Sequence, residues 1–351
     1  VTYLLWDTCY TLCDAPIFAL PTAMTSSVKE RSGFMTVGTV GGSLAAALAT
    51  VFLVPYAENN GYLKAAIIVA VVSFLAMSLI SLFGKERYKV KEEVLEKPAS
   101  LRDTWEYLIH NKYLLYFYAY RMISGSIAVS MLIYVAKYCL GDVKYMSMVV
   151  AISVIPICIL FLFSGKIFKR FDKIVVYRFC MIATILMNAI TLFVGYQNRT
   201  LAIACLVVIA VLAILPSILM GAIPQDCVEY GTYKTETRKE GITFALQTFA
   251  NKLTAAVATI ITGGVLTFVG YDVAAEKAAT EAHKVVEIAV SQATVSGMWK
   301  ASFIVPIIGQ LLAIGFLFAY NLRDKDVQIM SDCNAGKITK AEAEALLSRK
   351  Y

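Results

Sequence analysis

The sequence predicts an all-α, polytopic membrane protein, and three observations support that fold class. First, 59% of the 351 residues are hydrophobic and only 16% are charged, whereas soluble proteins carry about 25% charged residues. Second, apolar stretches recur along the whole chain with a length of about 20 residues, which a helix needs to cross a bilayer. Third, the segments between these stretches alternate in charge.

The sequence predicts nine membrane spans, at 3–24, 34–56, 65–83, 113–140, 145–165, 174–195, 201–223, 242–268 and 297–320. Every second connecting segment, together with the tail from Asn321, holds most of the 32 Lys and Arg residues. Because basic loops stay on the cytoplasmic side of a membrane, we expect these segments and the C-terminus in the cytoplasm. The net charge of +7 follows from these loops, so it does not indicate a nucleic-acid partner.

The charged segment 84–112 divides the spans into three before it and six after it. Six plus six helices joined by a cytoplasmic linker is the architecture of major facilitator transporters. Nine spans also leave Val1 outside the cell with no signal peptide before it. We therefore expect an N-terminally truncated major facilitator fold with about nine transmembrane helices, equivalent to helices four to twelve. Its expected parts are half of the N-terminal bundle (1–83), the linker (84–112), the six-helix C-terminal bundle (113–320) and a cytoplasmic tail (321–351).

Two short helices are expected outside the membrane, each marked by a capping signal. Ser100 precedes an acid at Asp103, which is typical of the start of a helix. Thr339 and Glu342 form a capping box, in which each side chain accepts a hydrogen bond from the backbone of the other residue. A helix is therefore predicted in the linker and another in the tail.

Asp14 lies near the middle of the first span, where a charge costs about 2.5–3.5 kcal/mol on insertion scales. Such a residue survives where it faces a protein interior or a watery cavity. Tyr10, Asp14 and Phe18 are spaced i, i+4, i+8 and share one helix face, with Thr11 one step round. A carboxylate between two aromatic rings suits a sugar, because it accepts hydroxyl hydrogens while the rings cover the C–H face. The alternative is that Asp14 only pairs with Lys252 and holds two helices together.

Lys252 is a second charge deep within a span, the eighth. It follows Thr248 by one helical turn, and Gln247 and Asn251 form another i, i+4 pair on the adjacent stripe. This polar strip predicts a surface that faces the substrate. Lys252 could donate to the substrate, to the acid of the first span, or to a carboxylate that binds a coupling ion.

Further charged residues are candidates for coupling or gating. Arg121 lies about eight residues into the fourth span, and its role is open between lining a cavity and bonding a neighbouring helix. The predicted cytoplasmic loop 224–241 carries charges of both signs, among them Asp226, Glu229, Lys234 and Arg238. These residues are either solvated, in which case their pairs contribute little, or they form cross-bundle salt bridges that lock one conformation.

The sequence gives no support for an enzyme, a cofactor or a metal centre. The eight cysteines are scattered without a CxxC pair, and both histidines lie between the predicted spans. No nucleophile–base pair is recognisable. We therefore expect no cofactor beyond a coupling cation.

Two stretches resemble a known family of transporters. TCYTLCDAPIFALPTAMT, residues 8–25, resembles the fourth-helix signature of the glycoside–pentoside–hexuronide:cation symporters, the family that includes melibiose permease. DCVEYGTYKTETRKEGITFALQTFANK, residues 226–252, is similar to the tenth-to-eleventh helix region of that family. The resemblance implies a twelve-helix major facilitator fold in the bacterial inner membrane. It also implies sugar uptake driven by Na⁺, H⁺ or Li⁺.

The same resemblance implies roles for individual residues. Asp14 matches the sugar-contacting acid of the family, and Tyr10 and Thr11 lie beside it. Lys252 matches a lysine between the sugar and cation sites, and Thr248 is its neighbour on the sugar side. The cation-binding carboxylates of the family belong to its second helix, so no metal ligand is identifiable in this sequence.

The prediction is a secondary active transporter that carries a sugar or glycoside with Na⁺ or H⁺ by alternating access. The predicted substrate-binding residues are Asp14, Tyr10, Thr11, Phe18, Gln247, Thr248 and Lys252. The coupling and gating candidates are Lys252, Arg121, Asp226, Glu229, Lys234 and Arg238. An alternative on the same fold is a transporter of an amphipathic lipid or another organic solute. The expected partners are one such small molecule and the lipid bilayer.

Overall fold

The computed structural model describes residues 44–83, 101–128, 131–236, 239–272, 290–349 and 351, with single positions at 5, 8, 9, 38, 41 and 42. All regular elements among these residues are helices, which confirms the all-α fold class. Six helical stretches of the described part are long and apolar enough to cross a membrane. The chain separates into two compact units, Val1–Pro98 and Ala99–Tyr351, and each is described by itself.

The described part of unit 1 includes a π-helical turn, η1 (Ala49–Leu53), followed by the α-helices α3 (Val54–Asn60) and α4 (Tyr62–Phe83). Gly61 joins α3 to α4 with a φ of 91°, in a region that a glycine enters without strain. The 22 residues of α4 are almost entirely apolar, and most of its large side chains are exposed within the unit. Such a surface suits lipid. Most of the predicted first span, 3–24, lies outside the described residues.

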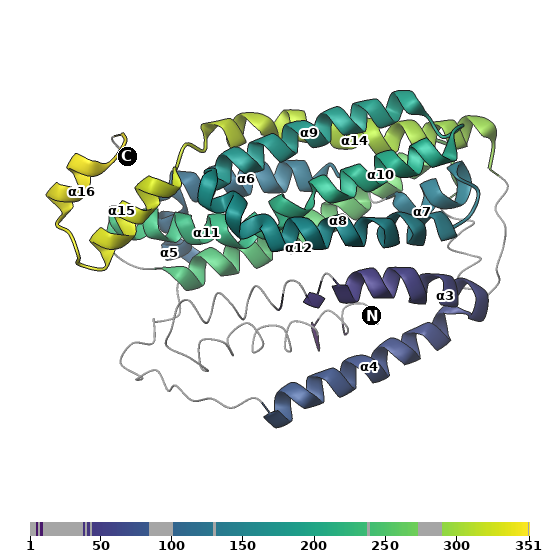
Figure 1. Cartoon of the computed structure of the whole chain (residues 1–351), viewed down its shortest axis with the longest axis horizontal. Coiled ribbons are helices and arrows are strands. Elements are labelled where there is room, and N and C mark those ends of the chain that lie inside the picture. The colour runs from purple at the N-terminus through teal and green to yellow at the C-terminus, as the bar shows by residue number, and fades with distance from the viewer. Residues whose placement is uncertain are drawn as a thin grey trace. The chain divides into compact units, whose positions relative to one another are not determined.

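Unit 2 is a bundle of long helices that lie lengthwise beside one another (Figure 1). The chain order is α5 (Leu101–His110), α6 (Lys112–Ser126), α7 (Leu132–Tyr134), η3 (Val135–Cys139), α8 (Lys144–Arg170), α9 (Lys173–Val194), α10 (Arg199–Leu212), α11 (Ile214–Thr235), α12 (Glu240–Phe268), α14 (Gln292–Ala319), α15 (Asp324–Asn334) and α16 (Lys340–Leu346). The short helices α5, α15 and α16 gather at one end, where the chain ends. The helix predicted in the linker is present as α5.

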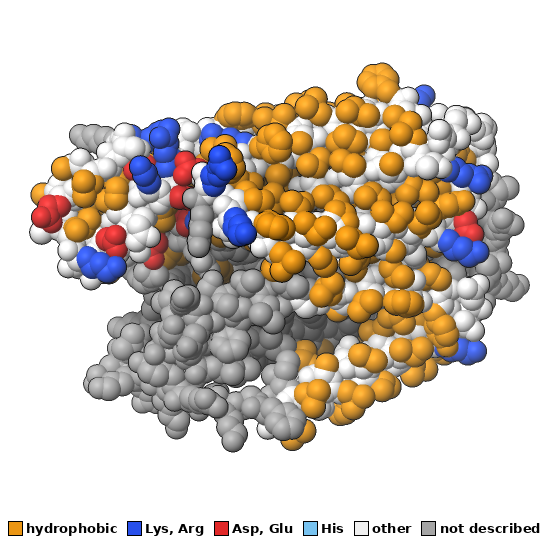
Figure 2. Space-filling view, in the orientation of Figure 1, with side chains coloured by type: hydrophobic (Ala, Val, Ile, Leu, Met, Phe, Trp, Pro, Cys, Tyr) orange, Lys and Arg blue, Asp and Glu red, His pale blue; other side chains and the backbone are white. Residues whose placement is uncertain are grey.

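Charged side chains are concentrated at the ends of this bundle (Figure 2). Hydrophobic side chains cover the middle of the long helices, while Lys, Arg, Asp and Glu gather mainly over α15 and α16. Apolar side chains that would be unfavourable in water dominate the exposed faces of α8 and α9, for example Leu162 and Phe193. This distribution matches a protein whose middle is solvated by lipid tails and whose ends are solvated by water.

The structure corrects two predicted boundaries. The fourth span, predicted as one helix over 113–140, is interrupted: α6 ends at Ser126 and helical structure resumes at Leu132. Ser124, Gly125 and Ser126 end α6, and serine and glycine are weak helix formers. The loop predicted at 224–241 is instead helical as far as Thr235. Tertiary packing explains this second difference, since most side chains of that stretch are buried.

Helices α6 and α14 pack closely because Gly309 of α14 has no side chain. A Cβ added there would come within 2.7 Å of the Ile127 Cβ and 3.5 Å of the Ser124 carbonyl oxygen. Small residues allow membrane helices to approach in this way. At Gly315, farther along α14, no atom of another described segment lies within 4 Å of the Cβ position.

We expect Gly309→Ala to lower the free energy of unfolding by about 1–3 kcal/mol, because overpacking forces side chains and backbone to shift. Gly315→Ala is the matched control on the same helix and should be neutral or should gain up to about 1 kcal/mol of helix propensity. The midpoints of thermal denaturation in detergent measure both effects. Equal midpoints for the two variants would contradict the close approach of α6 and α14.

The C-terminal tail packs onto the charged end of unit 2. Helix α15 contacts α11 and buries Asp326 and Met330. Helix α16 begins with the predicted capping box: the Thr339 backbone N–H donates to the Glu342 carboxylate across 2.8 Å, and the reciprocal bond is also present. The predicted tail helix and its cap are therefore confirmed.

The Asp326 carboxylate holds the last residues of the chain against α15. It accepts hydrogen bonds from the Ser348 backbone N–H at 2.9 Å, from the Ser348 hydroxyl at 2.6 Å and from the Tyr351 hydroxyl. Burial raises the pKa of Asp326, but these hydrogen bonds together outweigh burial and hold the pKa below its ordinary value. The ionised form is therefore part of the docked tail.

We expect the docked tail to loosen when the pH falls below the ordinary aspartate pKa of 3.8. Because docking depresses the pKa of Asp326, its stabilisation is complete above that value and is lost as the pH falls through the docked-state pKa. Hydrogen exchange of α15 and α16 across this range measures the effect. Burial raises the pKa of the neighbouring Asp324, whose contribution has the opposite sign, so an Asp324→Asn background isolates Asp326. Protection that is as sensitive to acid in Asp326→Asn as in the unchanged protein would contradict this assignment.

Candidate functional site

Pro224 lies inside α11 and changes the hydrogen bonding of that helix. A proline has no backbone N–H, so the carbonyl four residues earlier, that of Met220, loses its helical donor. Gln247 of α12 supplies a donor in its place: its Nε2 donates to the Met220 carbonyl oxygen across 3.2 Å. Freed carbonyls in membrane helices are satisfied by neighbouring helices in this way. The proline of one helix therefore fixes the orientation of a polar side chain on the next.

A pocket lies beside this contact, between α6, α11 and α12. Its enclosed space in this structure is small, about that of one water molecule, and the rest of the hollow opens to the exterior. The lining combines two aromatic rings with a guanidinium, two amides and a hydroxyl, from Phe117, Tyr118, Arg121, Met220, Gln247, Ala250, Asn251 and Thr254. Mostly apolar walls with a few well-placed polar groups are typical of sites for small molecules.

Close packing of α6 against α12 forms one wall of the pocket. A Cβ on Gly125 would come within 2.5 Å of the Thr254 methyl group, so glycine is needed at this crossing. Nearer the charged end of the bundle, the Tyr118 hydroxyl donates to the Thr243 carbonyl oxygen across 2.8 Å. These two contacts place Arg121, which lies between Tyr118 and Gly125 on α6, opposite the polar strip of α12.

The Oε1 atom of Gln247 is buried and accepts no hydrogen bond within the described part of the chain. Buried polar atoms are nearly always paired, so an unpaired acceptor at the edge of a pocket indicates that a donor arrives from elsewhere. By contrast, the Thr248 hydroxyl already donates to the Phe244 carbonyl oxygen across 3.2 Å. Gln247 is therefore the residue of the predicted strip that the structure equips most clearly to accept a ligand hydroxyl.

The structure brings some predicted site residues together and leaves others apart. Arg121 and Gln247 line one pocket, and Asn251 of the predicted strip joins them. Thr248 and Lys252 lie on the exposed side of α12, beside the pocket lining. The predicted ligands Asp14, Tyr10, Thr11 and Phe18 lie outside the described residues, as does the gating candidate Arg238.

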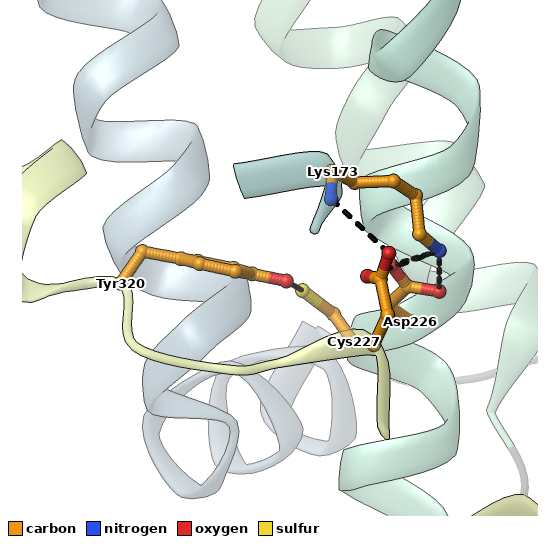
Figure 3. A network of polar contacts seen from close by, with 5 residues as sticks. Lys173, Asp226, Cys227 and Tyr320 are labelled. Atoms are coloured by element: carbon orange, nitrogen blue, oxygen red, sulfur yellow. Dashed lines mark hydrogen bonds and ion pairs between the residues drawn. The ribbon is translucent and has the colours of Figure 1, made fainter. Parts of the chain in front are cut away.

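Asp226, predicted as a loop residue, is buried in α11 and forms an ion pair (Figure 3). The Lys173 Nζ lies 2.6 Å and 2.5 Å from the two carboxylate oxygens of Asp226 and 3.7 Å from a carboxylate oxygen of Asp324. Through these contacts Lys173 of α9 joins α11 and α15. The side chain of the next residue, Cys227, points the other way, and its Sγ lies 3.6 Å from the Tyr320 hydroxyl.

The other gating candidates also have partners within unit 2. The Asn334 Nδ2 donates to the Glu229 carboxylate at 2.9 Å and to the Glu229 carbonyl oxygen at 3.0 Å. Lys234 donates to the backbone carbonyl of Tyr351. These contacts join α11 to the tail, so the described partners of these charges all belong to the same unit.

Sequence reasoning missed the partners of Asp226. Lys173 lies 53 positions away in the sequence, and helical spacing does not connect residues that far apart. A usable signal was present, because Ile223, Cys227 and Tyr230 follow a helical spacing through the segment predicted as a loop. No group of His, Cys, Asp or Glu side chains suited to hold a metal ion occurs among the described residues.

A multi-pass helical bundle with a polar pocket among apolar helices is the construction of a membrane transporter. Residues 1–324 match the model of a family described as MFS/sugar transport protein. The chain belongs to this family, within the glycoside–pentoside–hexuronide:cation symporters of the major facilitator superfamily. The predicted family is thereby confirmed, and it is a family of transporters rather than enzymes.

Three bacterial relatives illustrate the similarity. A protein of Escherichia coli K12, provisionally assigned to sulfoquinovose import, is 26% identical over 332 residues, which cover 92% of this chain and 68% of the relative. The uncharacterized symporter YjmB of Bacillus subtilis is 27% identical over 280 residues, which cover 77% of this chain and 60% of the relative. The lactose permease of Lactobacillus delbrueckii subsp. bulgaricus is 25% identical over 272 residues, which cover 73% of this chain and 43% of the relative. The chain thus spans about two thirds of the first relative and less of the other two.

Proposed function

We propose that this protein is a secondary active transporter that moves a sugar or glycoside across a bacterial cell membrane together with Na⁺ or H⁺, by alternating access. One observation carries the proposal: no residue in the described part of the chain donates to the buried Oε1 of Gln247, at the edge of a pocket that also offers Arg121 and Asn251. A sugar hydroxyl can donate to that oxygen and accept from the other two residues. The relatives assigned to sulfoquinovose import and to lactose transport support a sugar.

The polar lining favours a hydroxylated substrate over an amphipathic lipid. A lipid tail would bury the guanidinium and both amides without forming hydrogen bonds to them, and such burial is unfavourable. The rings of Phe117 and Tyr118 suit the C–H face of a sugar. We therefore keep the sugar as the proposed cargo.

Other parts of the proposal rest on the sequence motifs. Asp14, with Tyr10 and Phe18 on its helix face and Thr11 one step round, is proposed as a sugar ligand because its motif matches that of the family. Lys252 is proposed to link sugar binding to cation binding. If the cation raises the affinity for the sugar, the sugar must raise the affinity for the cation by the same factor. The basic segments and the tail are proposed to face the cytoplasm.

The test is uptake of a panel of labelled glycosides, pentosides and hexuronides into membrane vesicles that contain the protein expressed from its complete gene. Uptake of at least one sugar should depend on a Na⁺ or H⁺ gradient. Gln247→Leu should reduce the apparent affinity by about two- to tenfold, since it removes a neutral hydrogen bond worth about 0.5–1.5 kcal/mol. Lys252→Ala should uncouple or abolish uptake.

Gln328→Leu is the matched control, because Gln328 is exposed on α15 and lies outside the pocket. This variant should transport like the unchanged protein. If folded protein in the membrane takes up no sugar of the panel, the proposal fails. Uptake of a labelled lipid by the same vesicles would then favour the other cargo.

A further inference from the structure

Arg121 places a permanent positive charge inside the bundle of unit 2. It lies in α6, between the buried Tyr120 and the Gly125 crossing, and its side chain is half-buried. An arginine keeps its proton in proteins. Charged groups at such positions are costly, and they are retained where they serve a function.

A neutral side chain lies beside the guanidinium. It is that of Tyr177, a buried residue of α9, whose hydroxyl is near enough to Arg121 to interact with it electrostatically. Across the described ranges, the ion pairs join Lys144, Lys173, Lys337 and Lys340 to acids, and none involves Arg121. Tyr177 therefore positions Arg121 without neutralising it.

The rest of the pocket lining does not neutralise Arg121 either. Gln247 and Asn251 are amides, Thr254 is a hydroxyl residue, and none of the described residues that line the pocket carries a carboxylate. A neutral sugar would leave the guanidinium without a counter-ion in a partly enclosed space. An anionic group would compensate it, and the planar fork of an arginine matches the two oxygens of a carboxylate or a sulfonate.

We propose that the transported sugar is acidic, and that Arg121 binds its carboxylate or sulfonate while Gln247 and Asn251 bind its hydroxyls. This inference rests on the proposed function and names the class of sugar. Arg121 is thus a specificity-determining residue, and Tyr177 is a positioning residue that acts through it.

The test compares matched ligands on the purified protein from the complete gene. The carboxylate arm uses methyl β-glucuronide, its methyl ester and methyl β-glucoside, and the sulfonate arm uses methyl 6-sulfoquinovoside. Isothermal titration calorimetry gives each dissociation constant. One of the two acids should bind at least 100-fold more tightly than the neutral ligands, and the stronger arm identifies the anionic group.

Arg121→Gln should remove most of this preference, leaving the acid within about fivefold of the neutral ligands while their own affinity stays unchanged. Arg121→Lys keeps the positive charge but lacks the planar guanidinium. Its preference for the acid should therefore lie between that of the unchanged protein and that of Arg121→Gln. Tyr177→Phe should weaken binding of the acid several-fold without affecting the neutral ligands. It also serves as the second variant if Arg121→Gln does not fold. Arg199→Gln removes an exposed charge at the start of α10 and is the control. It should change neither the affinity for the acid nor the affinity for the neutral ligands.

The outcomes separate this inference from the proposed function. If neutral and acidic sugars bind equally, or if Arg121→Gln weakens both to the same degree, Arg121 is a packing residue and the inference is overturned. The proposed sugar transport would then still stand. If the folded protein binds no sugar of either kind, the proposed function itself fails.

Discussion

Asp226→Ala should lower the free energy of unfolding by about 3–5 kcal/mol, because removing one partner of a buried ion pair leaves the other charge uncompensated. The Lys173 side chain is partly buried, with 22% of it exposed. Its remaining acid, Asp324, lies farther away at 3.7 Å. The loss should appear as a lower denaturation midpoint in detergent and as weaker protection of α15 in hydrogen exchange.

A double-mutant cycle tests whether the ion pair is the cause. Lys173→Met combined with Asp226→Leu should cost less than the sum of the single variants, since replacing both charges by apolar groups leaves neither one buried alone. Asp324→Ala is the comparison on the same lysine. It should cost about 1–2 kcal/mol, less than Asp226→Ala: its ion pair is longer and more exposed, although its Oδ2 also accepts a hydrogen bond from the Lys173 backbone N–H across 3.1 Å. Additive losses in the cycle would rule out a coupled pair.

Arg178→Met should destabilise the junction of α9 and α14 by about 2–4 kcal/mol, since buried acceptors left without donors cost about 1–3 kcal/mol each. The Arg178 guanidinium donates to the carbonyl oxygens of Leu317 and Tyr320, at 3.2 Å and 2.5 Å for Nη2. The last carbonyls of a helix lack intrahelical donors, and a cation also interacts favourably with that end. Thermal denaturation measures the loss.

Arg178→Lys separates charge from geometry at this position. A lysine keeps the favourable interaction with the helix end but cannot span several carbonyls with a planar fork. It should therefore recover less than half of the lost stability. Arg199→Met, at an exposed position, is the control. If Arg178→Lys restores full stability, only the charge matters and the hydrogen bonds contribute nothing.

Most of the helices could be predicted from the sequence because an apolar run leaves few structural options. In a bilayer, every backbone group must be paired within the segment, so a run of about 20 apolar residues forms a helix. The predicted spans 174–195 and 242–268 correspond to α9 and α12 within a few residues. Local capping chemistry was equally readable, as Thr339 and Glu342 show.

The interruption after Ser126 and the helical extension of α11 to Thr235 could not be predicted in the same way. Both depend on packing between segments that are distant in the sequence. Asp226 and Lys173 are separated by 53 positions, and only the fold brings them within hydrogen-bonding distance. When the partners of a charged segment are unknown, its composition predicts a solvated loop.

The candidate site, too, was predictable from the sequence only in part. Periodicity placed Gln247, Asn251 and Lys252 on a polar part of one helix, and hydropathy identified Arg121 as a charge inside a span. The sequence alone therefore determined the fold class, the family and most of the polar residues. Only the tertiary structure decided that Gln247 faces the Met220 carbonyl, and that Arg121 lies in the same pocket as Gln247 with no acid among the described lining residues. The reason is physical: helical period fixes which residues share a face, whereas the contacts of that face depend on how the helices pack.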